Sequence, residues 1–195
     1  MEKIFIASQN MHKINEIQYI MGEKYKIYPV SDLIGNIEVE EYGKTFIENS
    51  VIKAVTIGDK INKPVIADDS GLCIEALNGF PGINSARFMN DKSYEEKTTY
   101  ILEKIRNEKN RKAYFVCVAT FYISGEFCFS YEGRVYGSIS KEIRGNKGFG
   151  YDPFFIPDGY EKTFAELGDE IKNEFSHRKL AFEGLIERLS LILKK

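Results

Sequence analysis

The sequence predicts an α/β protein with a mixed central sheet, a long hairpin and helices on both sides of the sheet. Two short apolar runs are each associated with a segment of helical periodicity, which indicates strands that alternate with helices. A long stretch rich in aromatic and β-branched residues is broken once, at Ser124-Gly125, and this pattern indicates an antiparallel hairpin. The order of these elements predicts the fold class.

The first half of the chain opens with a predicted buried strand at Ile4–Ala7, followed by a polar turn and a helix. A second helix begins at Thr45, which is spaced from Glu48 as in a capping box, and Pro64 ends that stretch. Val65–Ala67 is the next predicted strand, and we expect it to end at residues 68–71. The apolar stripes of the two helices are Ile14, Ile17, Ile20 and Met21 in the first and Ile47, Val51, Ala54 and Val55 in the second.

The second half contains a helix, the hairpin, a glycine-rich loop and a final helix. Ser93 and Glu96 form another capping box ahead of the helix that carries Ile101, Leu102 and Ile105. The hairpin strands are predicted at 113–123 and 127–135, and residues 145–153 are too rich in glycine for regular structure. The final helix is indicated by Phe182, Leu185, Ile186, Leu189 and Ile192.

Length and composition favour one globular domain, 1–195, as a single compact body or two tight lobes. The 27 Lys and Arg residues nearly balance the 29 Asp and Glu residues, so charge gives no reason to expect a nucleic acid or a membrane as a partner. Only four consecutive apolar residues stand near the amino terminus, which is too few for a signal peptide or a spanning helix. We therefore expect a cytoplasmic protein.

Cysteine and histidine are too scarce for a metal centre built on them. Cys73, Cys117 and Cys128 are an odd number of thiols at wide spacing within apolar runs, and we expect them to be buried and reduced. His12 and His177 are the two histidines.

The first polar cluster is Ser8, Gln9, Asn10, Met11, His12 and Lys13, between the first strand and the first helix. Free backbone N–H groups at a helix start favour an anion, and Lys13 adds a positive charge, so phosphate fits this turn. An ordinary N-cap with a solvated lysine is the alternative. The cluster is not a P-loop, because the glycines and the Gly-Lys-Ser/Thr ending are absent.

The second cluster, Asp68-Asp69-Ser70-Gly71, places two carboxylates at the carboxyl end of a buried strand, where open α/β sheets usually bind ligands. Oxygen ligands of this kind suit Mg²⁺, and Glu40 or Glu41 could add another carboxylate. A solvated turn is the alternative, since Asp-Ser-Gly is good turn chemistry.

Two further clusters stand in the last third of the chain. Residues 148–153 combine glycines, aromatic rings and Asp152, a set that can stack a base and bond its edge, although a packed structural turn would look alike. Lys172, His177 and Arg178 place cationic donors around the start of the last helix, where they could meet phosphate or a ring carbonyl. A solvated basic face is the alternative.

Taken together, the clusters resemble the family of inosine/xanthosine triphosphate pyrophosphatases, from residue 4 to the final helix. The motifs that carry the resemblance, in chain order, are Ser8…Asn10…Lys13, Thr45-Phe46-Ile47-Glu48-Asn49, Asp68-Asp69-Ser70-Gly71-Leu72, Pro81-Gly82…Ser85-Ala86-Arg87, Gly148-Phe149-Gly150-Tyr151-Asp152-Pro153 and Ser176-His177-Arg178. The resemblance implies two lobes around an active-site cleft and hydrolysis of ITP, dITP or XTP to the monophosphate and pyrophosphate.

The family pattern also assigns roles to residues of this sequence. It places the triphosphate on Ser8–Lys13 with help from Lys53, Ser70 and Lys172, and it places Mg²⁺ between Glu41 and Asp69. Asp69 is implied to be the general base for the water that attacks the α-phosphorus. The residues implied to hold a 6-oxo purine are Phe149, Gly150, Tyr151, Asp152, His177 and Arg178, and adenine would leave their donors unpaired.

One position departs from the family pattern, because Gln9 stands where that pattern usually has glycine. We expect altered affinity and retained activity, since Ser8, Asn10 and Lys13 remain. A nucleotide sensor that binds without hydrolysis is an alternative, which Lys13, Glu41 and Asp69 disfavour. A haloacid-dehalogenase-like phosphatase would need Asp-x-Asp, and a septum-inhibitor-type pyrophosphatase is disfavoured by the Ser-His-Arg motif.

The hairpin also predicts an assembly. It carries apolar residues on both faces, including Phe115, Tyr122, Phe127 and Phe129, and one face needs a cover. The resemblance implies a homodimer, and a closed two-fold assembly would bury such a face.

Overall fold

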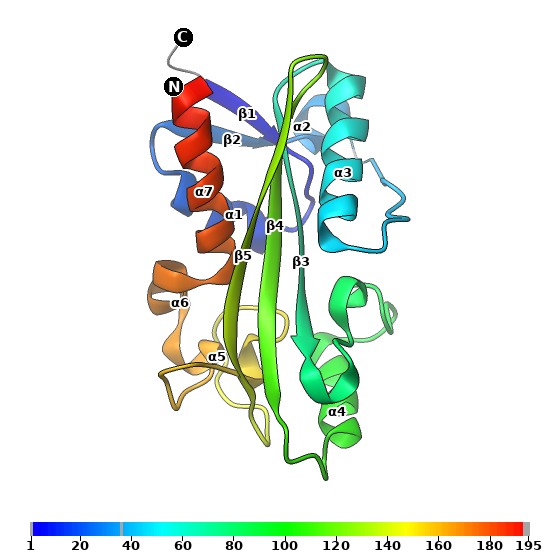
Figure 1. Cartoon of the computed structure of the whole chain (residues 1–195), viewed down its shortest axis with the longest axis vertical. Helices are drawn as coiled ribbons and strands as arrows, with labels where there is room; N and C mark the ends of the chain where they lie inside the picture. The colour runs from blue at the N-terminus through cyan, green and yellow to red at the C-terminus, as the bar shows by residue number, and fades with distance from the viewer. Residues whose placement is uncertain (1, 36, 193–195) are drawn as a thin grey trace. The chain divides into compact units, whose positions relative to one another are not determined.

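A computed structural model describes residues 2–35 and 37–192 and contains a six-stranded mixed sheet with helices (Figure 1). The order across the sheet is β2-β1-β3-β4-β5-β6. β1 lies parallel to both β2 and β3, whereas β6 lies antiparallel to β5. The strands are β1 (Glu2–Ile6), β2 (Tyr25–Pro29), β3 (Val65–Ile74), β4 (Lys112–Ile123), β5 (Phe127–Ile139) and β6 (Phe155–Pro157). The predicted fold class is confirmed.

Seven α-helices and three short 3₁₀ helices are present in the described part of the chain. The α-helices are α1 (Met11–Met21), α2 (Ser31–Ile34), α3 (Phe46–Ile61), α4 (Tyr94–Lys104), α5 (Phe164–Leu167), α6 (Asp169–Phe175) and α7 (His177–Ile192). The 3₁₀ helices are η1 (Glu75–Leu77), η2 (Gly82–Asn84) and η3 (Asp152–Phe154). None of the helices within residues 2–35 and 37–192 is long and apolar enough to cross a membrane.

The chain divides into two compact units, and β3, β4 and β5 contribute residues to both. Unit 1 comprises 1–69, 117–133 and 177–195, and unit 2 comprises 70–116 and 134–176. Each unit has its own hydrophobic core.

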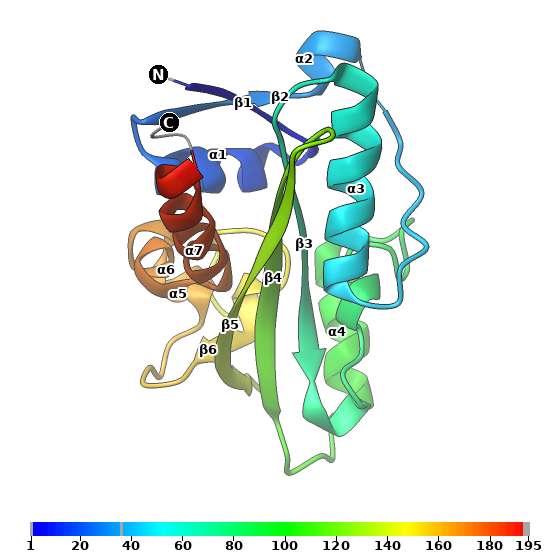
Figure 2. The ribbon, with the colours of Figure 1, turned by 45° about the horizontal axis from the view of Figure 1, so that its top comes forward.

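In unit 1, helices cover both faces of the strands (Figure 2). Ile6 and Ile66 point into the core formed with α1 and α7, whereas Val65 points to the other face and packs with Ile57 of α3. Successive strand residues point to opposite faces, so one short apolar run serves two cores. This arrangement fits the continuous apolar character of Val65–Ala67.

In unit 2, aromatic side chains pack together with aliphatic ones in the core. Phe115 of β4 lies 4.6 Å from Phe155 between ring centroids, and Phe155 stacks on Phe164 of α5 at 5.4 Å. Ile101 of α4 is fully buried in the same cluster. The core therefore anchors α4, α5 and the residues around η3 to the strands.

Both predicted capping boxes are present. The backbone N–H of Glu48 donates to Thr45 Oγ1 at 3.2 Å, and the Glu48 carboxylate accepts from the Thr45 N–H at 3.1 Å. Ser93 and Glu96 repeat the arrangement ahead of α4. These local signals place the starts of α3 and α4 because each satisfies N–H groups that the helix leaves unpaired.

The prediction that β3 ends before residue 68 is wrong, since the strand continues to Ile74. β3 lies between β1 and β4, and residues 65–69 and 71–74 are all buried. Burial between neighbouring strands overrides the turn propensity of Asp-Ser-Gly. Asp68 and Asp69 are therefore residues of a buried strand.

Other boundaries differ by a few residues. The second hairpin strand extends to Ile139, where it pairs with β6, and β1 ends at Ile6. The prediction of three buried thiols is wrong for Cys128, which is exposed near the start of β5, whereas Cys73 and Cys117 are buried. The apolar neighbours of Cys128 lie at the end of the hairpin, where β5 is open to solvent.

Candidate active site

The turn between β1 and α1 presents polar groups at a helix start. Asn10 is the N-cap, and its Oδ1 accepts the N–H groups of His12 at 3.0 Å and Lys13 at 3.3 Å. Ser8 Oγ accepts the Asn10 N–H at 3.2 Å, and Gln9 Nε2 donates to the Ile37 carbonyl at 3.4 Å. Met11 and His12 are exposed. Both interpretations of this cluster, a cap and an anion site, remain compatible with this geometry.

The Lys13 ammonium forms an ion pair with Asp68 and is therefore not a simple solvated lysine. Its Nζ lies 2.9 Å from Asp68 Oδ2, and Arg178 Nη2 lies 3.9 Å from the same oxygen. The Asp68 backbone carbonyl accepts from Lys53 Nζ at 2.6 Å. Burial alone would raise the pKa of Asp68, but Lys13, Arg178 and Lys53 hold it well below its usual range. Asp68 is thus an ionised carboxylate surrounded by cations.

Asp69 points the opposite way and meets α3 and the segment before it. Lys53 Nζ lies 3.5 Å from Asp69 Oδ1 and 2.9 Å from Glu41 Oε1. Asn49 Nδ2 donates to Asp69 Oδ2 at 3.3 Å. Because alternate strand residues face opposite sides, the adjacent carboxylates of β3 belong to two adjoining clusters, with Lys53 in contact with both residues. A turn would not have separated them in this way.

The pKa values around Asp69 differ from those of exposed groups. Burial raises the pKa of Asp69, and the nearby Glu41 carboxylate adds to the increase, whereas Lys53 opposes it. Burial alone would lower the pKa of Lys53, but the carboxylates of Asp69, Asp68 and Glu41 outweigh it, so this pKa is raised. A buried carboxylate with a raised pKa is a good proton acceptor.

Glu41 and Asp69 are the side chains that could hold a metal ion here. Both carboxylates pair with the Lys53 ammonium, so their oxygens already lie close enough together to share one positive charge. No group of three or more His, Cys, Asp or Glu residues suited to a metal occurs within residues 2–35 and 37–192. Mg²⁺ commonly uses one or two carboxylates and completes its octahedron with water and substrate phosphates. The donor set therefore fits Mg²⁺ and does not fit an all-protein metal cage.

The start of α7 is buried. His177 and Arg178 are 4% and 2% exposed, and Arg178 Nη1 donates to Glu16 Oε2 of α1. Glu16 and Asp68 together raise the pKa of Arg178 despite its burial, so the guanidinium is charged. The solvated basic face, which was the alternative for this cluster, is wrong, because Lys172, His177 and Arg178 are all buried.

Sequence reasoning missed Glu16. An acidic residue between Ile14 and Ile17, at the edge of the apolar stripe of α1, was the available signal, because a carboxylate on a buried helix face needs a partner.

In unit 2, the glycine-rich loop is held by a buried ion pair. Lys172 Nζ of α6 lies 2.7 Å from Asp152 Oδ2, both side chains are 2% exposed, and the same oxygen accepts the Phe149 N–H at 2.9 Å. The Lys172 ammonium also lies 4.5 Å from the centre of the Phe149 ring. Gly148 has φ +71°, and a Cβ there would collide with the Asp152 carboxylate. Lys172 and Asp152 thus shape the loop.

Tyr151 anchors the other side of this loop. Its hydroxyl donates to the Ser85 carbonyl at 2.8 Å. Ser85 Oγ in turn donates to the Gly82 carbonyl at 2.6 Å and accepts the Leu72 N–H of β3 at 2.9 Å. Tyr151 is buried, so its phenol contributes to structure here. Ser85, which belongs to the Pro-Gly…Ser-Ala-Arg motif, is a residue whose role only the fold reveals.

The predicted site residues fall into two groups, one in each unit. In unit 1 the ion pairs bring Lys13, Glu41, Lys53, Asp69 and Arg178 into two adjoining clusters around β3, with Ser8–His12 at the start of α1. In unit 2 the loop Phe149–Asp152 is joined to Lys172, and Ser70 lies half-buried in β3.

Comparisons with known proteins give a consistent result. The sequence profile described as the Ham1 family matches residues 4–188. The dITP/XTP pyrophosphatase of Nautilia profundicola is 41% identical over 184 residues, which cover 93% of this chain and 94% of that protein. The solved structure of the Ham1 protein of Staphylococcus aureus matches with a TM-score of 0.89 at 41% identity, covering 97% of this chain and 98% of that one. The solved structure of a HAM1 protein from Coxiella burnetii matches with a TM-score of 0.89 at 36% identity, covering 97% of this chain and 99% of that one.

Proposed function

This chain belongs to the Ham1 family, and on that premise we propose the residues and the metal ion with which it works. It is a nucleoside triphosphate pyrophosphatase that hydrolyses non-standard purine nucleotides (ITP, dITP and XTP) to the monophosphate and pyrophosphate. Hydrolysis of these nucleotides removes them from the nucleotide pool. The residue assignments rest on one main observation, the buried Asp69 carboxylate beside Glu41 and Lys53.

We assign the proton transfer to Asp69. Its raised pKa and its burial suit a carboxylate that accepts a proton from the water that attacks the α-phosphorus, with pyrophosphate as the leaving group. Asn49 fixes the orientation of the carboxylate through its bond to Oδ2, and Lys53 balances its charge. Glu41 and Asp69 would hold Mg²⁺, which when bound neutralises phosphate charge.

Triphosphate binding is assigned to Ser8–Lys13, Lys53, Ser70 and Lys172. Lys13 supports this assignment because it lies in the first turn of α1 and its ammonium is held at a fixed place by Asp68. The Lys172 ammonium lies at the Phe149 loop and bonds Asp152, so its assignment is supported by charge and less directly by position.

Purine recognition is assigned to the loop Phe149–Asp152 and to His177 and Arg178. The Phe149 ring and the glycine backbone suit stacking and edge contacts with a base. Arg178 is held between Glu16 and Asp68, which keeps its guanidinium charged and oriented as a donor. Donors at these positions favour a 6-oxo purine and disfavour adenine.

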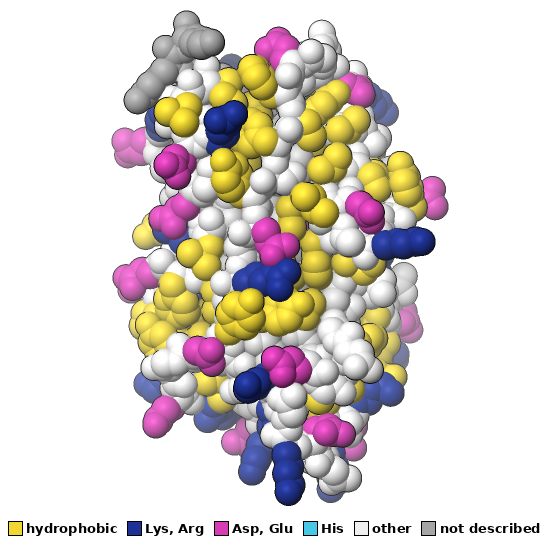
Figure 3. Space-filling view, in the orientation of Figure 1, with side chains coloured by type: hydrophobic (Ala, Val, Ile, Leu, Met, Phe, Trp, Pro, Cys, Tyr) yellow, Lys and Arg dark blue, Asp and Glu magenta, His cyan; other side chains and the backbone are white. Residues whose placement is uncertain are grey.

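We also propose that residues 1–195 form one domain and that two copies form a homodimer in the cytoplasm. Three strands run through both units, and neither unit is a continuous stretch of chain, so we expect a single cooperative unfolding transition. Apolar side chains lie along the hairpin on the face drawn in Figure 3, and Phe127, Tyr131 and Tyr136 are 42%, 36% and 55% exposed. A second copy would cover this face.

The function is tested with a panel of ITP, dITP, XTP, ATP and GTP, with Mg²⁺ or with a chelator, and with separate detection of pyrophosphate and orthophosphate. We expect pyrophosphate from the first three substrates and a loss of turnover without the metal. Glu41→Gln should lose most activity, whereas the exposed neighbour Glu40→Gln serves as the matched control and should retain it. Orthophosphate as the first product, or equal loss in both variants, would contradict the assignments.

A further inference from the structure

The first turn of α4 lies against the loop that we assign to purine binding. The rings of Tyr94 and Tyr151 meet edge to face, with centroids 5.1 Å apart and an interplanar angle of 84°. A Cβ built on Gly150 would lie 3.7 Å from Tyr94 Cε1 and 3.9 Å from Cζ, so the Gly150 backbone faces the same ring. The Tyr94 ring therefore contacts Tyr151 and lies beside the backbone of Gly150, the residue before it.

Lys97 also contacts the ring of Tyr94. The Lys97 ammonium lies 4.9 Å from the centre of the Tyr94 ring and donates to the Ala86 carbonyl at 2.7 Å. Ala86 follows Ser85, whose carbonyl accepts the Tyr151 hydroxyl. Lys97 is 3% exposed, so it is a fixed support and not a mobile surface lysine. The Tyr94 ring thus contacts both Lys97 and the loop.

The loop needs support at Gly150 because this residue has no side chain of its own to pack against the protein. Gly150 has φ +65° and no side chain, and the other bonds of the loop act on its neighbours, since the Asp152 carboxylate bonds the Phe149 N–H and Lys172, and the Tyr151 hydroxyl bonds the Ser85 carbonyl. The Tyr94 ring lies beside the Gly150 backbone, where a Cβ would be in van der Waals contact with it. Tyr94 is also 38% exposed, whereas Lys97, Thr98 and Ile101 are the buried residues of the same helix, so burial of its own surface does not account for its place.

We propose that Tyr94 is a positioning residue for purine binding, acting through Gly150 and Tyr151 to hold the Gly148–Asp152 turn in the shape that receives the base. The inference rests on the proposed assignment of this loop to the base. Asp69, Glu41 and Lys53 belong to the other unit, so the hydrolytic step does not depend on Tyr94. Loss of the ring therefore weakens substrate binding and leaves the chemical step intact.

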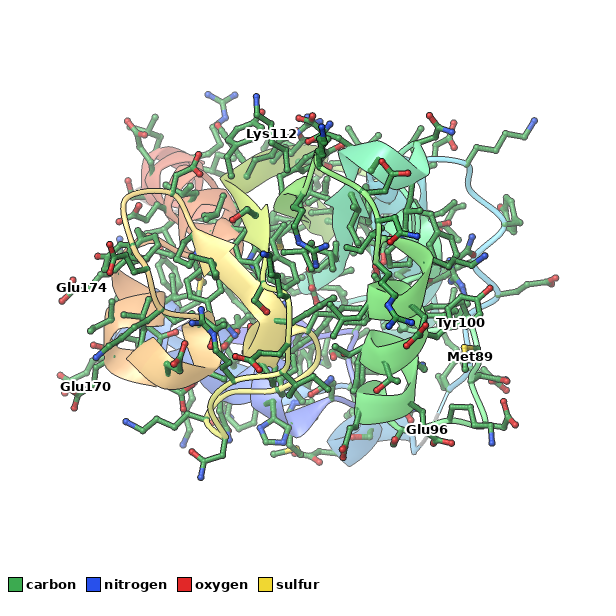
Figure 4. All side chains as sticks on the ribbon, turned by 90° about the horizontal axis from the view of Figure 1, so that it is seen from below. Met89, Glu96, Tyr100, Lys112, Glu170 and Glu174 are labelled. Atoms are coloured by element: carbon green, nitrogen blue, oxygen red, sulfur yellow. The ribbon has the colours of Figure 1, made fainter. Side chains whose placement is uncertain are left out.

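The experiment compares Tyr94→Ala and Tyr94→Phe with Tyr100→Ala. Tyr100 lies further along the same helix (Figure 4) and is 41% exposed. Its ring packs on Phe88, so it is a matched control on the same helix. The readouts are kcat and KM for ITP and the inhibition constant of inorganic tripolyphosphate, which carries the phosphates without a base.

We expect Tyr94→Ala to raise KM for ITP about three- to tenfold, the range of one aromatic pair, with kcat within about twofold of the parent. The inhibition constant of tripolyphosphate should not change. Tyr94→Phe keeps the ring and should behave as the parent, and Tyr100→Ala should do so as well. Tyr94→Leu, which keeps apolar volume without a flat ring, replaces the alanine variant if the latter does not fold, and its KM should also rise.

Three results would overturn the inference: equal KM values for Tyr94→Ala and Tyr100→Ala, a parallel rise in the tripolyphosphate constant, or a Tyr94→Phe variant that behaves as Tyr94→Ala. Phe149→Ala separates this failure from failure of the proposed function. If Phe149→Ala raises KM for ITP and Tyr94→Ala does not, the loop binds the base without help from Tyr94. If neither variant changes KM, the assignment of the loop to the base is wrong.

Discussion

Replacing Asp152 by Asn tests whether the buried ion pair of unit 2 holds the glycine-rich loop. The change keeps the shape of the side chain and removes the charge that faces Lys172 Nζ at 2.7 Å. Asn can still accept the Phe149 N–H, which now bonds Asp152 Oδ2 at 2.9 Å. The perturbation is therefore confined to the electrostatic partner of a buried ammonium.

The expected loss follows from burial. Removal of one member of a fully buried ion pair costs about 3–5 kcal/mol, because the remaining charge keeps its desolvation penalty without its partner. The Lys172 ammonium also lies 4.5 Å from the centre of the Phe149 ring and 5.9 Å from that of Phe164. These cation–π contacts remain in the variant and offset about 1 kcal/mol of the cost of the unpaired charge. We therefore expect Asp152→Asn to lower the free energy of unfolding by about 2–4 kcal/mol.

The assay is urea denaturation of the parent, Asp152→Asn, Lys172→Met and the double variant. The double variant removes both charges, so it should recover at least half of the loss of the single variants, which gives a favourable coupling energy. Glu183→Gln is the control, since Glu183 forms a pair of similar length with Lys179, at 2.9 Å, but on the surface, where it contributes about 0–1 kcal/mol.

A loss below about 1 kcal/mol for Asp152→Asn, equal to that of Glu183→Gln, would show that the pair behaves as a surface pair. Additive losses in the double variant would show that the two charges do not interact. Either result would refute the reasoning that the Lys172 pair shapes the loop.

Three further predictions concern chemistry, selectivity and assembly. Asp69→Asn keeps the bond from Asn49 and should retain the fold, while pyrophosphate release falls by about two to four orders of magnitude; near-parental turnover would remove Asp69 as the base. Arg178→Ala should reduce kcat/KM for ITP more than for ATP, by about tenfold to a hundredfold in the ratio, as expected for one charged hydrogen bond. An equal loss on all purine triphosphates would mean that Arg178 acts through its ion pairs with Glu16 and Asp68. Light scattering at micromolar concentration should give twice the 22.4 kDa mass of one chain, and a species of 22.4 kDa alone would contradict the homodimer.

Much of the fold was predictable from local patterns. The starts of α3 and α4 follow from Thr45 with Glu48 and from Ser93 with Glu96, because a capping box satisfies helix N–H groups within four residues of chain. The hairpin follows from its composition and from Ser124-Gly125. The order of polar motifs pointed to the family because several separate clusters occur together in one chain.

The course of β3 through residues 68–71 and the separation of Asp68 from Asp69 were decided by tertiary structure. Asp-Asp-Ser-Gly has the local preferences of a turn, and it stays extended because Asp68, Asp69 and Gly71 are buried within a strand of the sheet. The partners of these carboxylates come from α1, α3 and α7, which lie far away in sequence. The sequence by itself determined which chemical groups are available and which segments form elements, since those depend on neighbouring residues. Only the fold decided which charges meet and how deeply they are buried, and these two factors set the pKa of Asp69 and the charge of Arg178.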